Sequence, residues 1–115
     1  MGYESKMYIM NRFEIDGMVN AIKVATFDLC KMGWGNGFHD LFDQEIDYEI
    51  WDGDEHSRED LYGDVCKWAP VGRVVEWLRN EVKHNDYRRL RPFLGLLEGF
   101  DESQWSGLQV VHYGH

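Results

Sequence analysis

Acidic side chains are concentrated between residues 40 and 64, where eleven Asp and Glu residues stand against one basic residue, Arg58. This segment sums to −10, whereas residues 1–39 hold four acids and four bases and residues 65–115 hold six acids and seven bases, giving a net charge of −9. A patch of this sign repels the phosphates of nucleic acids and membranes and attracts cationic surfaces. The chemistry that it best supports is binding of a basic protein or a divalent metal ion.

The sequence predicts that this acidic segment forms a surface for a basic partner protein. Asp47 and Glu49 fall on one side of a predicted strand, about 6.6 Å apart, and DNA carries one negative charge per about 1.7 Å of its axis. The most specific form of the hypothesis is DNA mimicry, which requires neighbouring loop acids to complete that charge density. Trp51 is included because Trp is enriched among the residues that dominate interfaces. The predicted partner-binding residues are Asp40, Asp43, Glu45, Asp47, Glu49, Trp51, Asp52, Asp54, Glu55, Glu59 and Asp60.

Oxygen and imidazole ligands for a metal ion occur in the same segment, at Asp52, Asp54, His56, Glu59 and Asp60. The ligand order of an EF-hand, Asp-x-Asp-x-Asp-Gly with a terminal Glu, is absent. His39, beside Asp40 and Asp43, lacks the HExxH or paired Cys and His spacing of zinc sites. The sequence therefore favours a solvated acidic loop, and we expect no cofactor; a small metal-binding domain is an alternative.

Two further motifs bear on the class of protein. Gly33, Gly35 and Gly37 precede a possible helix, but they do not match GxGxxG and no Lys-Ser/Thr follows them. Positive charge is concentrated only at residues 83–91, where it can contact phosphates or pair with the domain's own acids. The sequence singles out no nucleophile with its base and no pair of carboxylates. We therefore expect neither an enzyme nor direct binding of nucleic acid.

The composition is that of a folded domain. The chain is 43% hydrophobic and 15% aromatic, too apolar for a disordered acidic tail, and 115 residues predict one domain over 1–115. No basic region followed by an apolar run opens the sequence, and no stretch approaches about eighteen apolar residues, so we expect neither a signal peptide nor a membrane span. Cys30 and Cys66 lack a CxxC spacing and are expected to be buried free thiols.

The first half of the chain has the pattern of strands. Met7 and Ile9 alternate with Tyr8 and Met10, which predicts a strand over residues 3–15. Asp16-Gly17 is a turn signal, and the segment 19–32 after it fits either a strand or a helical face. A strand paired with the first is favoured, because the segment is rich in β-forming residues.

A loop is predicted at residues 33–37, followed by one helical turn around Phe38, Leu41 and Phe42. A third strand with one acidic side is predicted next, since three apolar residues alternate with two acids and a Trp, and Asp52-Gly53 ends it. Residues 54–67 are polar and predict irregular structure. The alternating residues are Ile46, Asp47, Tyr48, Glu49, Ile50 and Trp51.

The second half changes to a helical period. Pro70 suits the first turn of a helix, and five apolar residues follow at helical spacing: Val71, Val74, Val75, Leu78 and Val82. A break at residues 85–86 precedes a second helix, interrupted or restarted at Pro92 and closed near Gly99. A polar loop at 101–107 leads to a last strand at 108–113. The expected fold is α+β, with an antiparallel sheet of about four strands packed against two helices.

Five segments of the chain carry a resemblance to a known family. They are Gly-Tyr-Glu-Ser-Lys-Met-Tyr-Ile near the start, Ala-Thr-Phe-Asp-Leu-Cys-Lys-Met-Gly at 25–33, residues 60–63, Tyr-Arg-Arg-Leu-Arg-Pro-Phe-Leu at 87–94, and the closing Val-Val-His-Tyr-Gly. Together they resemble a family of small uncharacterised bacteriophage proteins. The resemblance implies a phage origin and action in the cytoplasm of the infected bacterium. By analogy of class, small acidic phage proteins often inhibit host enzymes that act on nucleic acids, including restriction and CRISPR systems, some by imitating DNA.

The sequence thus predicts an acidic phage-type protein that binds and inhibits a basic host protein that handles nucleic acid. Such an inhibitor would associate with its partner in a salt-sensitive way. The alternatives are an accessory or structural phage protein without inhibitory role, which would assemble with itself, and the small metal-binding domain, which a cation would stabilise.

Overall fold

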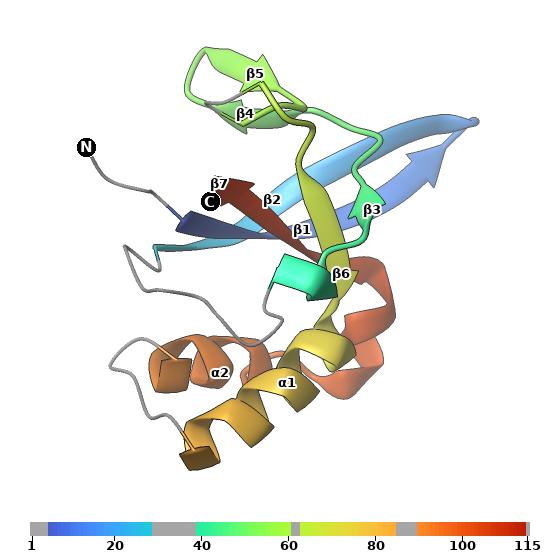
Figure 1. Ribbon diagram of the computed structural model, residues 1–115. Helices are drawn as coiled ribbons and strands as arrows, with labels where there is room; N and C mark the ends of the chain where they lie inside the picture. The colour runs from blue at the N-terminus through green and yellow to red at the C-terminus, as the bar shows by residue number, and fades with distance from the viewer. Residues whose placement is uncertain (1–4, 29–38, 61–62, 85–89, 115) are drawn as a thin grey trace.

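The computed structural model describes residues 5–28, 39–60, 63–84 and 90–114, which form an α+β fold (Figure 1). An antiparallel five-stranded sheet has the order β2-β1-β7-β6-β3, and a separate two-stranded sheet pairs β4 with β5. The elements are β1 (Ser5–Ile15), β2 (Met18–Asp28), the 3-10 helix η1 (His39–Leu41), β3 (Gln44–Glu45), β4 (Ile50–Asp52), β5 (Glu55–Ser57), β6 (Lys67–Pro70), α1 (Val71–His84), α2 (Leu90–Glu98), the 3-10 helix η2 (Glu102–Gly107) and β7 (Leu108–Gly114). The predicted fold class is confirmed.

β1 and β2 form the hairpin that the turn signal predicts. Ile15 pairs with Met18, so the turn consists of Asp16 and Gly17, whose φ angles are 51° and 79°. A two-residue turn with positive φ at both positions matches the right-handed twist of its strands and favours Asp-Gly. The strand favoured after this turn is confirmed as far as residue 28. Residues 29–32, the predicted loop at 33–37 and the predicted break at 85–86 lie outside the described ranges.

Both helices pack on one face of the sheet (Figure 1). α1 begins directly after Pro70, which has no backbone N–H that would need a partner there. The predicted apolar stripe is confirmed: four of its residues are buried and Val82 is partly buried. Phe93 of α2 is fully buried and stacks on Phe27, with 5.1 Å between ring centroids. The main residues of this helix-side core are Met7, Ile9, Val71, Val74, Leu78, Leu90, Phe93, Leu97 and Val110. None of the helices in the described ranges is long and apolar enough to cross a membrane.

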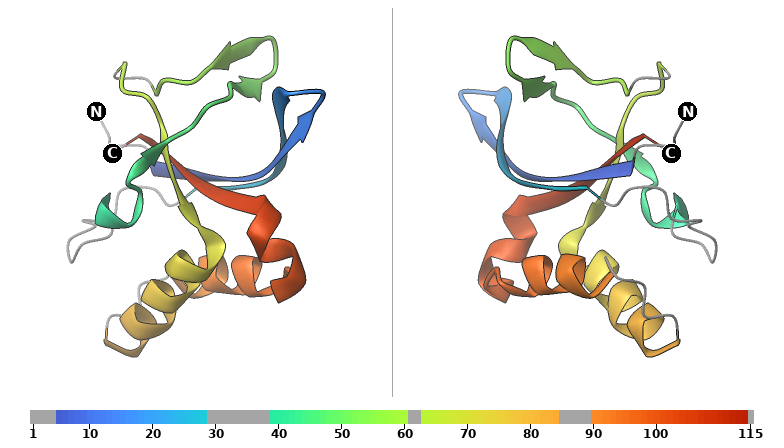
Figure 2. Two further views of the ribbon diagram at one scale, coloured as in Figure 1. Left: turned by 90° about the vertical axis from the view of Figure 1, so that its right-hand side faces the viewer. Right: turned by 90° about the vertical axis from the view of Figure 1, so that its left-hand side faces the viewer.

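The opposite face of the sheet is covered by the acidic segment rather than by water. Views from two sides show the helices, the sheet and the segment that runs between β3 and β6 as three successive layers (Figure 2). This second core contains Tyr8, Met10, Ile46, Tyr48, Ile50, Cys66 and Val111. β7 lies between β1 and β6, and it is buried on both faces because each face has its own cover. The alternation in β1 therefore sorts its residues between two cores instead of between a core and solvent.

Three local predictions for residues 44–70 are wrong. The single third strand is two short strands in different sheets, β3 and β4, because the chain leaves the sheet edge after Glu45 and crosses the second face. Residues 54–67 are not all irregular: β5 pairs with β4, and Glu59 forms an isolated bridge with Val65. β6 adds an unpredicted strand between β3 and β7. In addition, the polar segment after α2 forms the helix η2 instead of a loop.

The end of the β1–β2 hairpin extends beyond the sheet. β7 pairs with β1 only as far as Asn11, so the last residues of β1 and the first of β2 have only each other as strand partners within the described ranges. The register shifts where Ile9 faces Ala25 and Met10 faces Lys23, which leaves Val24 as an extra residue. A bulge bends a strand and increases its twist. The hairpin bends away from the helices and toward the acidic segment (Figure 2).

Candidate functional site

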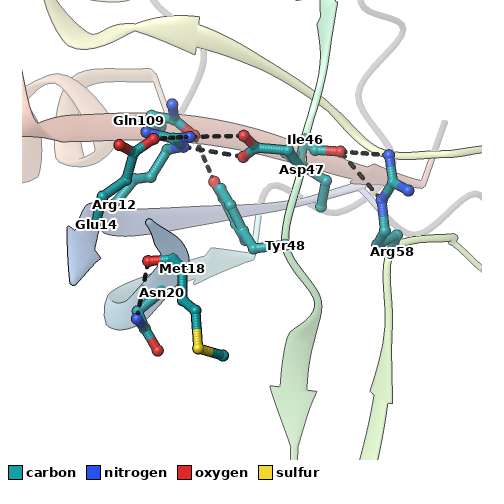
Figure 3. A network of polar contacts seen from close by, with 9 residues as sticks. All are labelled: Arg12, Glu14, Met18, Asn20, Ile46, Asp47, Tyr48, Arg58 and Gln109. Carbon is teal, nitrogen blue, oxygen red and sulfur yellow. Dashed lines mark hydrogen bonds and ion pairs between the residues drawn. The ribbon is translucent and has the colours of Figure 1, made fainter. Parts of the chain in front are cut away.

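The acidic segment lies on the sheet through its alternate residues. Ile46 is fully buried, and Tyr48 and Ile50 are nearly so, while Asp47 and Glu49 between them are exposed. The hydroxyl of Tyr48 donates a 2.6 Å hydrogen bond to Oε1 of Gln109, itself a buried polar residue of β7 (Figure 3). Burial raises the pKa of the Tyr48 phenol. The predicted burial pattern is correct although the predicted single strand is wrong. Alternate apolar residues turn toward a core in either arrangement.

Basic residues fix the path of this segment. Arg58, the one base within it, donates from Nε and Nη2 to the carbonyl oxygen of Ile46, at 3.2 and 2.8 Å (Figure 3). The carbonyl of Cys66 accepts the backbone N–H of Ile46 at 3.0 Å. The Cys66 thiol is free and buried, and burial raises its pKa to about 12. Arg58 therefore supports the backbone and does not form an ion pair with a carboxylate in the described ranges.

Asp47 is held by a residue of the hairpin. Arg12 donates from Nε and Nη2 to its two carboxylate oxygens at 2.9 and 2.7 Å, and Nη2 also contacts Glu14 (Figure 3). The two hydrogen bonds from Arg12 hold the pKa of the Asp47 carboxyl below its usual range and raise the pKa of the guanidinium. Sequence reasoning did not identify Arg12, because the two residues are 35 positions apart in the sequence and leave no local signal. Asp47, one of the two acids proposed for DNA mimicry, is thus paired with a base of the same chain.

The other of these two acids is engaged too. Oε2 of Glu49 contacts Nδ1 of His56 on β5, and the His56 ring stacks on Trp51 with 4.2 Å between centroids. Trp51 is 58% exposed. Lys23 of β2 donates to the carbonyl oxygen of Trp51 at 3.1 Å, and its Nζ lies 5.4 Å from the centroid of the Tyr8 ring. The β4–β5 hairpin is therefore attached to β2 by the side chain of Lys23.

Two more of the predicted residues have local roles. Asp43 forms an exposed ion pair with Arg73 of α1 at 3.2 Å. Oδ1 of Asp60 accepts the backbone N–H of Asp64 at 3.1 Å, which closes a turn. The side chain of Asp52 lies outside the described part of the structure, although its backbone belongs to β4. Exposed pairs of this kind contribute only about 0–1 kcal/mol each, and they lower the charge that the segment presents.

Five predicted carboxylates are exposed and have no ion-pair partner among the described residues. They are Asp40, Glu45, Asp54, Glu55 and Glu59. Asp40 belongs to η1, and Glu45 pairs through its backbone with Lys67 of β6. The other three lie on or beside the β4–β5 hairpin. The structure thus divides the predicted surface into two exposed acids near η1 and β3 and three near β5.

The three acids near β5 share a pocket. Asp54, Glu55 and Glu59 line a recess of about 420 Å³ between the β4–β5 hairpin and the sheet. Its other walls include the rings of Tyr8 and Tyr113, which meet edge to face at 5.8 Å. No Lys or Arg is among the described residues that line it. Carboxylates beside aromatic rings attract a cationic group both by charge and by the negative faces of the rings.

Other Trp residues and the basic residues at the end of α1 are not brought into this site. Trp68 packs against the second core, and Trp105, which packs against the helix-side core, donates from Nε1 to the carbonyl of Phe100. Trp51 is the exposed Trp of the described ranges. Lys83 and His84 are exposed at the end of α1, distant in sequence from the acids. Within the described ranges, no group of three or more His, Cys, Asp or Glu side chains is placed to hold a metal ion.

Comparisons with known proteins add no relative: no family model matches the chain, and no curated protein or solved structure is similar to it.

Proposed function

We propose that this protein binds a basic partner protein through the pocket beneath the β4–β5 hairpin and thereby inhibits it. The observation that carries the proposal is the placement of Asp54, Glu55 and Glu59 around one recess with two Tyr rings. A Lys or Arg side chain of the partner fits this chemistry, because it brings a positive charge to the three acids and contacts an aromatic ring, as Lys23 of the chain itself does at Tyr8. The remaining exposed acids steer the partner toward the pocket.

The resemblance to small phage proteins supports a proposal for the kind of partner. In that setting the target is a basic host protein that handles nucleic acid, and the protein acts in the cytoplasm of the infected bacterium. A site on such a target that accepts phosphates is lined by Lys and Arg. Asp47 and Glu49, the two acids of the sequence hypothesis, are paired within the chain. If the protein mimics DNA, the mimicry therefore uses Asp54, Glu55 and Glu59 instead.

A triple variant with a matched control tests the site. Asp54→Asn, Glu55→Gln and Glu59→Gln together remove three charges from the pocket. The control, Glu76→Gln, Asp101→Asn and Glu102→Gln, removes three charges from exposed positions elsewhere. The two variants have the same net charge, so long-range attraction is matched and only the local contact differs.

Two measurements follow. Titration of a fluorescent arginine-rich peptide gives the affinity for a defined cation, and we expect the pocket variant to bind at least about tenfold more weakly than the control, a difference of about 1.4 kcal/mol. Capture from bacterial lysate at low and high salt then identifies the target, whose DNA binding or cleavage is assayed with and without the protein. The proposal fails if the pocket variant binds peptide and target as the control does, or if the captured target keeps its full activity.

A further inference from the structure

The large apolar side chains that remain exposed gather on one element. Among the described residues they are Ile15, Met18, Ile22 and Val24, exposed by 56, 69, 56 and 45%, and Trp51. The first four belong to the β1–β2 hairpin, and the backbone of Trp51 is bonded to Lys23 of the same hairpin. A monomer seldom exposes an apolar patch larger than a few hundred Å², and larger patches mark contact sites. The distribution therefore indicates an interface along this hairpin.

The same hairpin has an open edge. β2 is the last strand of the sheet, and no strand in the described ranges pairs with its outer side. In an antiparallel strand, every second residue directs its N–H and C=O to that outer side. Proteins usually protect such an edge with charges, bulges, Pro or a short strand. β2 is 11 residues long, has no Pro, and carries its first charge only at Lys23, next to the bulge at Val24.

We propose that β2 pairs antiparallel with β2 of a second copy of the chain, about a twofold axis at Ala21. Residues then face each other at positions that sum to 42, so Met18 lies opposite Val24 and Asn20 opposite Ile22. Lys23 faces Val19, and no like charges are opposed. A twofold axis normal to the sheet keeps each side chain on its own face, so the exposed apolar residues of both copies meet.

In this register, a groove beside β2 lies next to the Met18 side chain of the second copy. It has a volume of about 380 Å³ and lies between β2 and η2, where Val24, Phe100 and Leu108 form its apolar part beside Asn11 and polar residues of η2. Met18 of the second copy, opposite Val24, reaches the mouth of this groove. Met adapts to irregular apolar cavities because its side chain is unbranched and flexible. The pairing thus covers the most exposed apolar residue of the hairpin.

Charge favours a second copy over a basic partner at this surface. The segment from residue 5 to residue 28 holds Lys6, Arg12 and Lys23 against Glu14, Asp16 and Asp28, so its net charge is zero. A basic protein is drawn instead to residues 40–64, where the acids lie. Two copies still repel through their net charge of −9 each, and salt screens that repulsion. Self-association must therefore strengthen as salt rises, and the inference does not depend on the acidic pocket.

Sedimentation equilibrium of the full chain at low and high salt tests the pairing. We expect a monomer–dimer equilibrium that shifts toward dimer in high salt. Ile22→Lys introduces a charge into the interface, and we expect it to raise the dissociation constant at least about tenfold. Asn80→Lys on the exposed side of α1 adds the same charge elsewhere and should leave it within about threefold, because a distant surface change has little effect. The inference is overturned by a monomer at all concentrations and both salts, by open-ended assembly, or by equal effects of the two variants.

The register has its own test. With Cys30 replaced by Ser, Ala21→Cys puts two thiols opposite each other across the twofold axis, whereas Val19→Cys separates them by four residues along the strands. Mild oxidation should link the Ala21→Cys chains into a covalent dimer much faster than the Val19→Cys chains, because a disulfide needs Cβ atoms about 4 Å apart. Cys66 is buried and serves as an internal control. Equal rates for the two variants would reject the pairing about Ala21.

Discussion

Removal of one buried hydroxyl tests how the acidic segment is attached to the sheet. Tyr48→Phe keeps the ring that fills the second core but deletes the donor to Gln109. A net hydrogen bond contributes about 0.5–1.5 kcal/mol, and a buried acceptor left without its donor costs about 1–3 kcal/mol. Both groups are at least nine-tenths buried, so water does not readily replace the donor. We expect the free energy of unfolding to fall by about 2 kcal/mol, within the 1–3 kcal/mol that such an unsatisfied group costs.

Urea denaturation followed by Trp fluorescence measures this change, and a thermal melt should show a drop of about 8 °C if each kcal/mol corresponds to about 4 °C. Replacement of both partners, Tyr48→Phe with Gln109→Met, removes the orphaned acceptor as well. The double variant should therefore lose less stability than the sum of the two single variants, since an apolar pair of similar shape is nearly neutral. A loss below about 0.5 kcal/mol for Tyr48→Phe, or strict additivity in the cycle, would refute the buried hydrogen bond as an attachment.

Two further changes have outcomes that the structure fixes. Leu78→Ala removes a fully buried side chain of α1 and should lower the free energy of unfolding, measured in urea, by about 2–5 kcal/mol. The control, Asn80→Ala on the exposed side, should lower it by less than about 0.5 kcal/mol. Similar denaturation midpoints for the two variants would contradict the packing of α1. Because the pKa of Asp47 is lowered in the folded protein, its pair with Arg12 stabilises above the unfolded pKa of about 3.9 and ceases to do so as pH falls through the lower folded value. Because the pair is exposed, Asp47→Asn should lower the free energy of unfolding by at most about 1 kcal/mol at neutral pH. The unfolding curves of the variant and the unmodified protein should converge in strong acid. A constant difference at all pH values would argue against the pair.

The sequence indicates burial more reliably than strand pairing in this chain. Alternation at Ile46, Tyr48 and Ile50 correctly predicts that these three face a core, because a period of two states only which side is apolar. The same pattern arises in a segment that crosses a sheet face and in a strand within the sheet. Which of the two occurs depends on what else covers that face, and a single sequence does not specify it.

The helices were predictable because their signals are local. In α1, Pro70 precedes a stripe repeated over more than three turns, and every position needed for the prediction lies within 15 residues. β6 has no such signal: it is four residues long and ends in Pro70, a residue that seldom occurs inside strands. Its pairing with β7 and β3 holds it in the sheet, so tertiary contacts override weak propensity there.

The candidate site shows a similar division between local and distant information. The count of acids in residues 40–64 located the region. The bases that neutralise Asp43 and Asp47 are Arg73 and Arg12, which lie 30 residues after and 35 residues before them. Tyr8 and Tyr113 reach the pocket from the two ends of the chain, because β1 and β7 are neighbours. Composition therefore predicted the sign of the surface, and the sheet topology determined which acids remain exposed.

The acidic pocket and the apolar hairpin respond to salt in opposite directions, and this difference follows from where the charge lies. Binding at the pocket joins opposite charges, so screening over about 8 Å at physiological ionic strength weakens it, more so at higher salt. Pairing of β2 joins two chains of like net charge through a neutral, apolar edge, so the same screening strengthens it. One salt series on the unmodified protein, with mass and peptide binding measured in parallel, therefore separates the two surfaces: if both processes weaken together, the hairpin contact is electrostatic and the β2 pairing is wrong.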